Sequence, residues 1–192
     1  MEHQHYTIQT PKDKPEYRKA FLRFVILDQS FDKVFLQRKR IETAKAIPDL
    51  KVLFADIHFF LVVVTNVMEG FKDLRTVIKN DRELSTNYYN QELNAIYKKY
   101  IPQLEYLNIF RDHLEHITDG RLDGLGKNNH PLKNPGMLGN LFGDDYDFGG
   151  EKFNLIESFS MLDEFYSELR VWNKRAKIYP LWQIELDSRA SK

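Results

Sequence analysis

The sequence contains no cysteine, which excludes both a disulfide framework and a thiolate metal site. It also lacks an excess of charge of either sign, because 28 basic and 28 acidic residues cancel. The chain therefore has no overall positive field of the kind on which nonspecific nucleic-acid binders depend. A nucleic-acid role would require a local basic patch. The absence of cysteine fits a reducing compartment, and we expect a cytoplasmic protein.

Long apolar segments and common catalytic signatures are missing as well. Residues 1–13 are polar and lack the apolar core of a secretory signal. The most apolar run, 57–68, is well short of the ~20 residues needed to cross a bilayer, so we expect a buried core helix and no membrane partner. The sequence has no Gly-x-Ser-x-Gly, His-Glu-x-x-His or kinase-type motif, which leaves hydrolase, zinc-protease and kinase functions without support. We expect no metal and no cofactor.

The residues that are present predict an all-α fold. Of the 192 residues, 42% are hydrophobic, which is enough for one sizeable core. Apolar residues three and four apart predict four long helices in an up-and-down bundle. We expect these helices at about 15–47, 51–78, 85–119 and 155–177.

The glycine-rich segment between the third and fourth long helices predicts a small β-hairpin appendage. Alternating residues on both sides of Gly149-Gly150 indicate two strands, and 137–142 is a candidate third strand. The expected organisation is a polar N-terminal segment, one bundle domain with a loop and hairpin insertion, and a C-terminal tail. These parts cover residues 1–14, 15–177 with the insertion at about 120–155, and 178–192.

An arginine near the end of the third helix occupies a position where an apolar residue is expected. Arg111 falls within roughly 60° of the apolar stripe that includes Leu104, Leu107 and Leu114. A guanidinium is costly to bury without an anionic partner, so this position calls for a carboxylate or a phosphate. His116 follows five residues later.

This Arg111-Asp112-x3-His116 spacing at the end of a long bundle helix resembles the Arg-x4-His motif of HEPN domains. The resemblance implies a homodimer whose paired motifs face one another and, in active members, a metal-independent endoribonuclease that acts on RNA. It further implies that His116 is the general base or acid, that Arg111 holds the phosphate, and that Asp112 orients His116. The family's usual settings, toxin–antitoxin pairs and phage defence, would supply a cognate antitoxin protein as a partner.

Other residues add candidate roles and open alternatives. Arg38, Lys39 and Arg40 form a basic cluster that, with Arg121, could bind an RNA substrate. His58 lies in the most apolar stretch, where a core histidine that donates to a carbonyl is expected.

The site residues also have a purely structural interpretation. Arg111 and Glu115 are four apart, as are Asp112 and His116, so ordinary pairs within one helix could account for them. A buried arginine could instead pair with an acid of another helix, for which the candidates are Asp56, Glu69, Asp163 and Glu164. A HEPN-like dimeric interaction or scaffold protein without catalysis is the alternative function.

Overall fold

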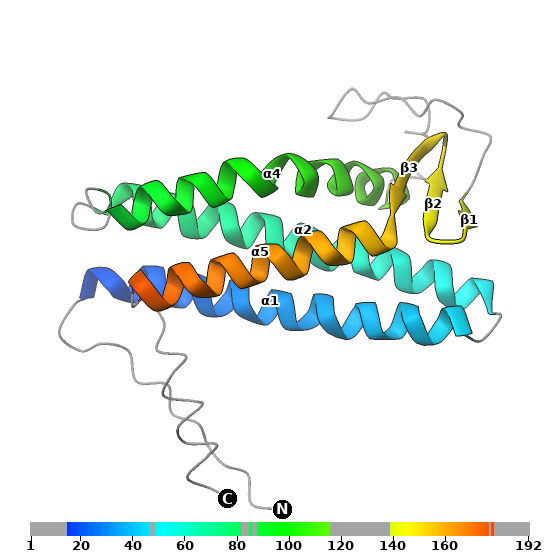
Figure 1. Ribbon diagram of the computed structural model, residues 1–192, viewed down its shortest axis with the longest axis horizontal. Coiled ribbons are helices and arrows are strands. Elements are labelled where there is room, and N and C mark those ends of the chain that lie inside the picture. The colour runs from blue at the N-terminus through cyan, green and yellow to red at the C-terminus, as the bar shows by residue number, and fades with distance from the viewer. Residues whose placement is uncertain are drawn as a thin grey trace, which may run out of the picture.

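The computed structural model describes residues 15–46, 49–81, 85, 88–115, 139–176 and 178 of the chain. Within them the chain forms four long helices that run up and down along one another, with a small sheet at one end (Figure 1). The expected helical bundle is therefore confirmed in its general architecture. The elements are α1 (Pro15–Ala46), α2 (Leu50–Asn80), α4 (Tyr88–Glu115), β1 (Asn140–Phe142), β2 (Asp145–Phe148), β3 (Glu151–Asn154) and α5 (Leu155–Ala176). The predicted N-terminal segment, most of the C-terminal tail and residues 116–138 lie outside the described residues.

Helix α2 is central because it packs against both α1 and α4. Its first turn is capped by Asp49, whose carboxylate accepts hydrogen bonds from the backbone amides of Lys51 and Val52. By length and composition α2 could cross a membrane, a test that the core helix of a soluble protein also passes. Eleven of its residues, spread from Leu53 to Ile78, are buried.

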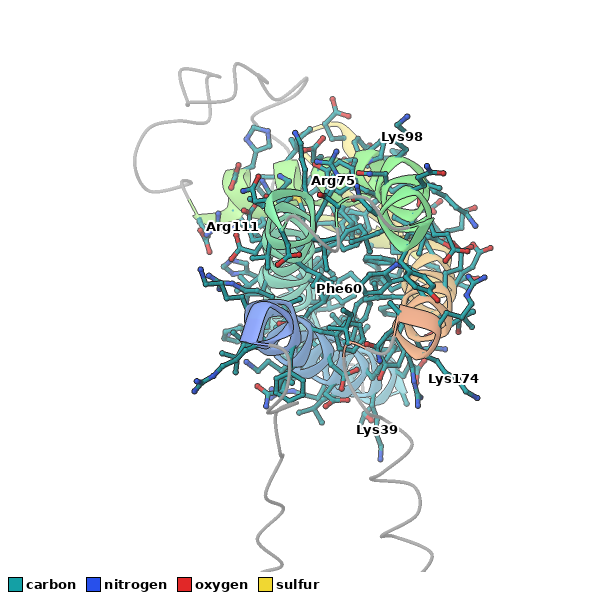
Figure 2. The ribbon with its side chains drawn as sticks, turned by 90° about the vertical axis from the view of Figure 1, so that its left-hand side faces the viewer. Lys39, Phe60, Arg75, Lys98, Arg111 and Lys174 are labelled. Carbon is teal, nitrogen blue, oxygen red and sulfur yellow. The ribbon has the colours of Figure 1, made fainter. Side chains whose placement is uncertain are left out.

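Aromatic residues from all four helices meet in the bundle interior. The ring of Phe165 on α5 lies 5.2 Å from Phe31 of α1, 4.8 Å from Phe71 of α2 and 4.8 Å from Tyr100 of α4, measured between ring centroids. Phe60 also points into the middle of the bundle (Figure 2). These contacts join the helices around one core, as the spacing of apolar residues predicts.

The predicted hairpin is present, and a third strand extends it to an antiparallel sheet in the order β1-β2-β3. Gly149 and Gly150 connect β2 to β3 with φ angles of 60° and 83°, a left-handed conformation that a tight hairpin turn favours. The sheet follows α4 and precedes α5 in the chain, but it does not separate these helices in space. Helices α4 and α5 pack against each other, and the sheet lies beyond them at the end of the bundle (Figure 1).

Two aromatic contacts fix the sheet at this end. Phe153 of β3 lies 4.8 Å from Phe110 near the end of α4, and Tyr146 of β2 lies 5.9 Å from Phe54 near the start of α2, between ring centroids. The hydroxyl of Tyr106 also donates a 2.7 Å hydrogen bond to the carbonyl of Lys152. The sheet therefore fixes the end of the bundle at which α4 ends and α2 begins.

Candidate functional site

Arg111, labelled in Figure 2, lies one turn before the end of α4. This end of α4 lies beside the sheet (Figure 1). Its side chain is 30% exposed, so the predicted inward position is realised only in part. The guanidinium is neither sealed in the core nor fully solvated. A ligand arriving from outside the bundle can therefore reach part of this side chain.

Two carboxylates of the same helix bind the Arg111 guanidinium. One terminal nitrogen lies 2.8 Å from Oδ1 of Asp112, and the other pairs with Glu115 one turn further along. The remaining nitrogen, Nε, is buried and makes no hydrogen bond. Because a buried donor without a partner is costly, Nε is the part of the guanidinium that a ligand would satisfy.

The Arg111–Glu115 pair confirms one structural prediction, whereas the prediction of a partner on another helix is wrong. Each of the four candidate acids pairs with a different cation, because a nearer cation lies on its own or a neighbouring helix. The pairs are Asp56 with Arg40, Glu69 with Lys72, Asp163 with Arg38, and Glu164 with Lys99.

A chain of hydrogen bonds connects the Arg111 pair to α2. The Thr65 hydroxyl lies 2.8 Å from the Asn108 side-chain oxygen, and the Asn108 amide donates to Oδ2 of Asp112 at 3.2 Å. The other carboxylate oxygen of Asp112, Oδ1, accepts a 2.8 Å hydrogen bond from a terminal nitrogen of Arg111. Asp112 thus positions Arg111 relative to a second helix, whereas its predicted role is to orient His116.

His116, the predicted acid or base, lies outside the described residues, as does Arg121. It directly follows Glu115, the last residue of α4. The predicted pairing of Asp112 with His116 therefore stays a prediction. The part of the motif that the structure describes is the arginine and the two carboxylates that hold it.

The basic cluster of α1, Arg38 to Arg40, does not lie near Arg111. Figure 2 shows Lys39 on the side of the bundle opposite Arg111. Arg38 binds Glu42 at 2.9 Å and Asp163 at 2.7 Å, and Arg40 binds Asp56 at 2.9 Å. These cations serve contacts among α1, α2 and α5, so RNA held by Arg111 would not reach them on the same face of one chain.

The electrostatic balance at the end of α4 limits what the site can bind. One guanidinium faces the two carboxylates of Asp112 and Glu115, which leaves a formal excess of one negative charge among these three groups. Phosphate binding there therefore requires further positive charge from outside these three groups. Among the described residues, no group of three or more His, Cys, Asp or Glu side chains is arranged to hold a metal ion.

One histidine of α2 departs from its predicted role as a satisfied core residue. His58 of α2 is half-buried rather than sealed in the core, and its buried Nε2 makes no hydrogen bond. The predicted satisfied core histidine is therefore not what the structure shows at this nitrogen. The signal that could have identified it is its spacing of two helical turns from Thr65 on the same face of α2.

Comparison of the chain with protein-family models, curated proteins and solved structures gives no match. The HEPN-like assignment therefore depends on the Arg-x4-His spacing and on its place at the end of a long bundle helix. Any function must accordingly be argued from the site itself.

Proposed function

We propose that this chain is a HEPN-like helical-bundle protein that cleaves RNA without a metal at the C-terminal end of α4. The observation that carries the proposal is the positioning of Arg111. Its guanidinium is held at a helix end by Asp112, which is itself fixed through Asn108 to Thr65 of α2. An exposed ion pair needs no such support, whereas a group that must meet a phosphate gains from it, because catalysis depends on preorganised geometry.

The proposed reaction uses the chemistry of the two motif residues. The 2′-hydroxyl of RNA attacks the adjacent phosphate, and His116 accepts its proton. The O2′–P bond forms, the bond from phosphorus to the 5′-oxygen breaks, and that oxygen takes up a proton and leaves as a 5′-hydroxyl. A 2′,3′-cyclic phosphate remains. Arg111 stabilises the negative charge on the phosphate, with Nε as its uncommitted donor. Together with a homodimer that pairs two motifs, this defines a cytoplasmic enzyme of the toxin or phage-defence type, with an antitoxin protein as its partner.

A second candidate function is a non-catalytic dimeric interaction protein built on the same bundle. The observation that favours it is the pairing of Arg111 with two carboxylates, which neutralise the cation before any phosphate arrives. In that case the end of α4 would contribute to contacts between subunits or with a protein partner.

The decisive experiment is incubation of the purified protein with RNA in the presence of a chelator. The enzyme proposal predicts cleavage that leaves 2′,3′-cyclic phosphate ends, and His116→Ala should lower the rate about 10²–10⁴-fold. His113→Ala is the matched control, because it removes an imidazole from the last turn of the same helix, and it should retain most of the activity. Undiminished cleavage by His116→Ala would falsify the assignment of the base.

The Arg111→Met variant separates the two functions. If the parent does not cleave RNA and the variant loses its dimer by light scattering, the interaction function is supported. A variant that is more stable than the parent, with its oligomeric state unchanged, indicates a replaceable structural ion pair and contradicts both functions for this residue.

A further inference from the structure

The half-buried His58 lies on the seam between α2 and α4. Thr65 of α2 and Asn108 of α4 define this seam through their 2.8 Å contact. His58 precedes Thr65 by seven residues, which is two helical turns, so the two side chains share a face of α2 to within about 20°.

The same spacing on α4 leads to the candidate site. Glu115 follows Asn108 by seven residues and therefore lies on the same face of α4. Helices α2 and α4 run in opposite directions (Figure 1). His58, seven residues before Thr65, and Glu115, seven residues after Asn108, therefore lie at the same level along the bundle. His58 consequently lies across the seam from the last turn of α4, about 10 Å beyond the Thr65 contact.

Two of the unsatisfied nitrogens among the described residues thus belong to one end of one seam. Nε of Arg111 and Nε2 of His58 are both buried and both lack a hydrogen-bond partner. Asp112 and Glu115 pair with Arg111, and among the described residues no acceptor meets Nε2 of His58. A ligand that carries oxygens along the seam would satisfy both nitrogens at once.

We propose that His58 is a second catalytic histidine, which donates the proton to the leaving 5′-oxygen of the cleaved RNA. This inference rests on the ribonuclease function proposed above. Cleavage needs a base for the 2′-hydroxyl and an acid for the 5′-oxygen, and within one chain His116 accounts for the base alone. In the step assigned to His58, the bond from phosphorus to the 5′-oxygen breaks as the proton on Nε2 passes to that oxygen, and the imidazole is left neutral.

The test compares ordinary RNA with RNA whose scissile 5′-oxygen is replaced by sulfur. A thiolate leaves without a proton, so the sulfur substrate does not need a general acid. We expect His58→Ala to slow the cleavage of ordinary RNA about 10²–10³-fold but to cleave the sulfur substrate within several-fold of the parent. His116→Ala should be slow on both substrates, because both require deprotonation of the 2′-hydroxyl.

The outcomes separate this inference from the proposed function. Cleavage of ordinary RNA at the parental rate by His58→Ala, or equal loss on both substrates, overturns the role of His58 and leaves the ribonuclease intact. A parent that cleaves neither substrate overturns the ribonuclease function itself. His58→Gln serves as a second variant if the alanine variant does not fold, with the same pattern expected.

A binding measurement gives a readout that does not depend on turnover. In NMR spectra of the parent, titration with a 3′-phosphorylated mononucleotide should shift the ring C–H signals of His58, which the His58→Gln spectrum identifies. The shift should be lost in the Arg111→Met variant, because the two residues hold one phosphate. Unchanged His58 signals at a saturating nucleotide concentration contradict the proposal.

Discussion

The Phe165 side chain is the point at which the four helices are most directly joined, and its truncation makes a quantitative prediction. Phe165 is fully buried and contacts one aromatic ring on each of α1, α2 and α4. Truncation of a buried phenylalanine to alanine costs about 3–5 kcal/mol, the sum of the lost transfer free energy and the cavity left behind. Since three rings lose a partner and they belong to three different helices, we expect Phe165→Ala to fall in the upper half of this range, at about 4 kcal/mol. For a chain of this size that free energy corresponds to a fall in Tm of roughly 8–16 °C.

The assay is urea unfolding followed by circular dichroism, with the midpoint and the slope of the transition both fitted. The matched control is Val171→Ala on the same helix, where a 54% exposed side chain should change the free energy of unfolding by less than about 0.5 kcal/mol. A loss below about 1.5 kcal/mol for Phe165→Ala at an unchanged slope would refute the reasoning. It would mean that the four helices do not depend on one shared core.

Two further predictions concern the end of the bundle that carries the sheet. Asp56→Ala should destabilise the protein by about 2 kcal/mol in the same assay, because it removes the buried carboxylate that Gln37 and Arg40 bind, although the exposed Arg40 can recover its hydration; an unchanged midpoint contradicts this. Burial raises the pKa of Tyr146 to about 12, above its ordinary value of 10.0. Since this pKa is raised by folding, Tyr146 contributes stability that is fully present below pH 10 and is lost as the pH rises toward 12. Between pH 10 and 12 the free energy of unfolding should therefore fall less steeply with pH for Tyr146→Phe than for the parent. Equal slopes for the two proteins would show that burial does not control the titration of Tyr146.

The regular part of the fold follows from local patterns in the sequence. Pro15 and the apolar spacing after it predict α1 to within one residue, and Gly149-Gly150 predicts the hairpin turn. These features succeed because each depends on residues close together in the chain, either on one helix face or in one turn. The position of the sheet in space does not follow in this way. It depends on the contacts of Phe110 and Phe54 with the strands, which join distant parts of the chain.

Only the contacts of the candidate site that lie within one helix could be predicted from the sequence. The pairing of Arg111 with Glu115 follows from their spacing on one helix, and the structure confirms it. The roles of Asn108 and His58 require the alignment of α2 against α4, which a single sequence does not provide. Periodicity tells which residues face inward but not which of them meet, so a polar residue on a seam looks the same as one in a sealed core.

The direct passage of β3 into α5 has a mechanical consequence for the whole molecule. Asn154 ends the strand and Leu155 begins the helix, and the amide of Leu155 also donates to the carbonyl of Asp144 at 2.9 Å. Because no linker separates β3 from α5, a movement of the sheet is transmitted directly to this helix. A partner that binds the strands and changes their orientation would therefore also rotate α5. Because Phe165 of α5 contacts the other three helices, this rotation would change the packing of the whole bundle.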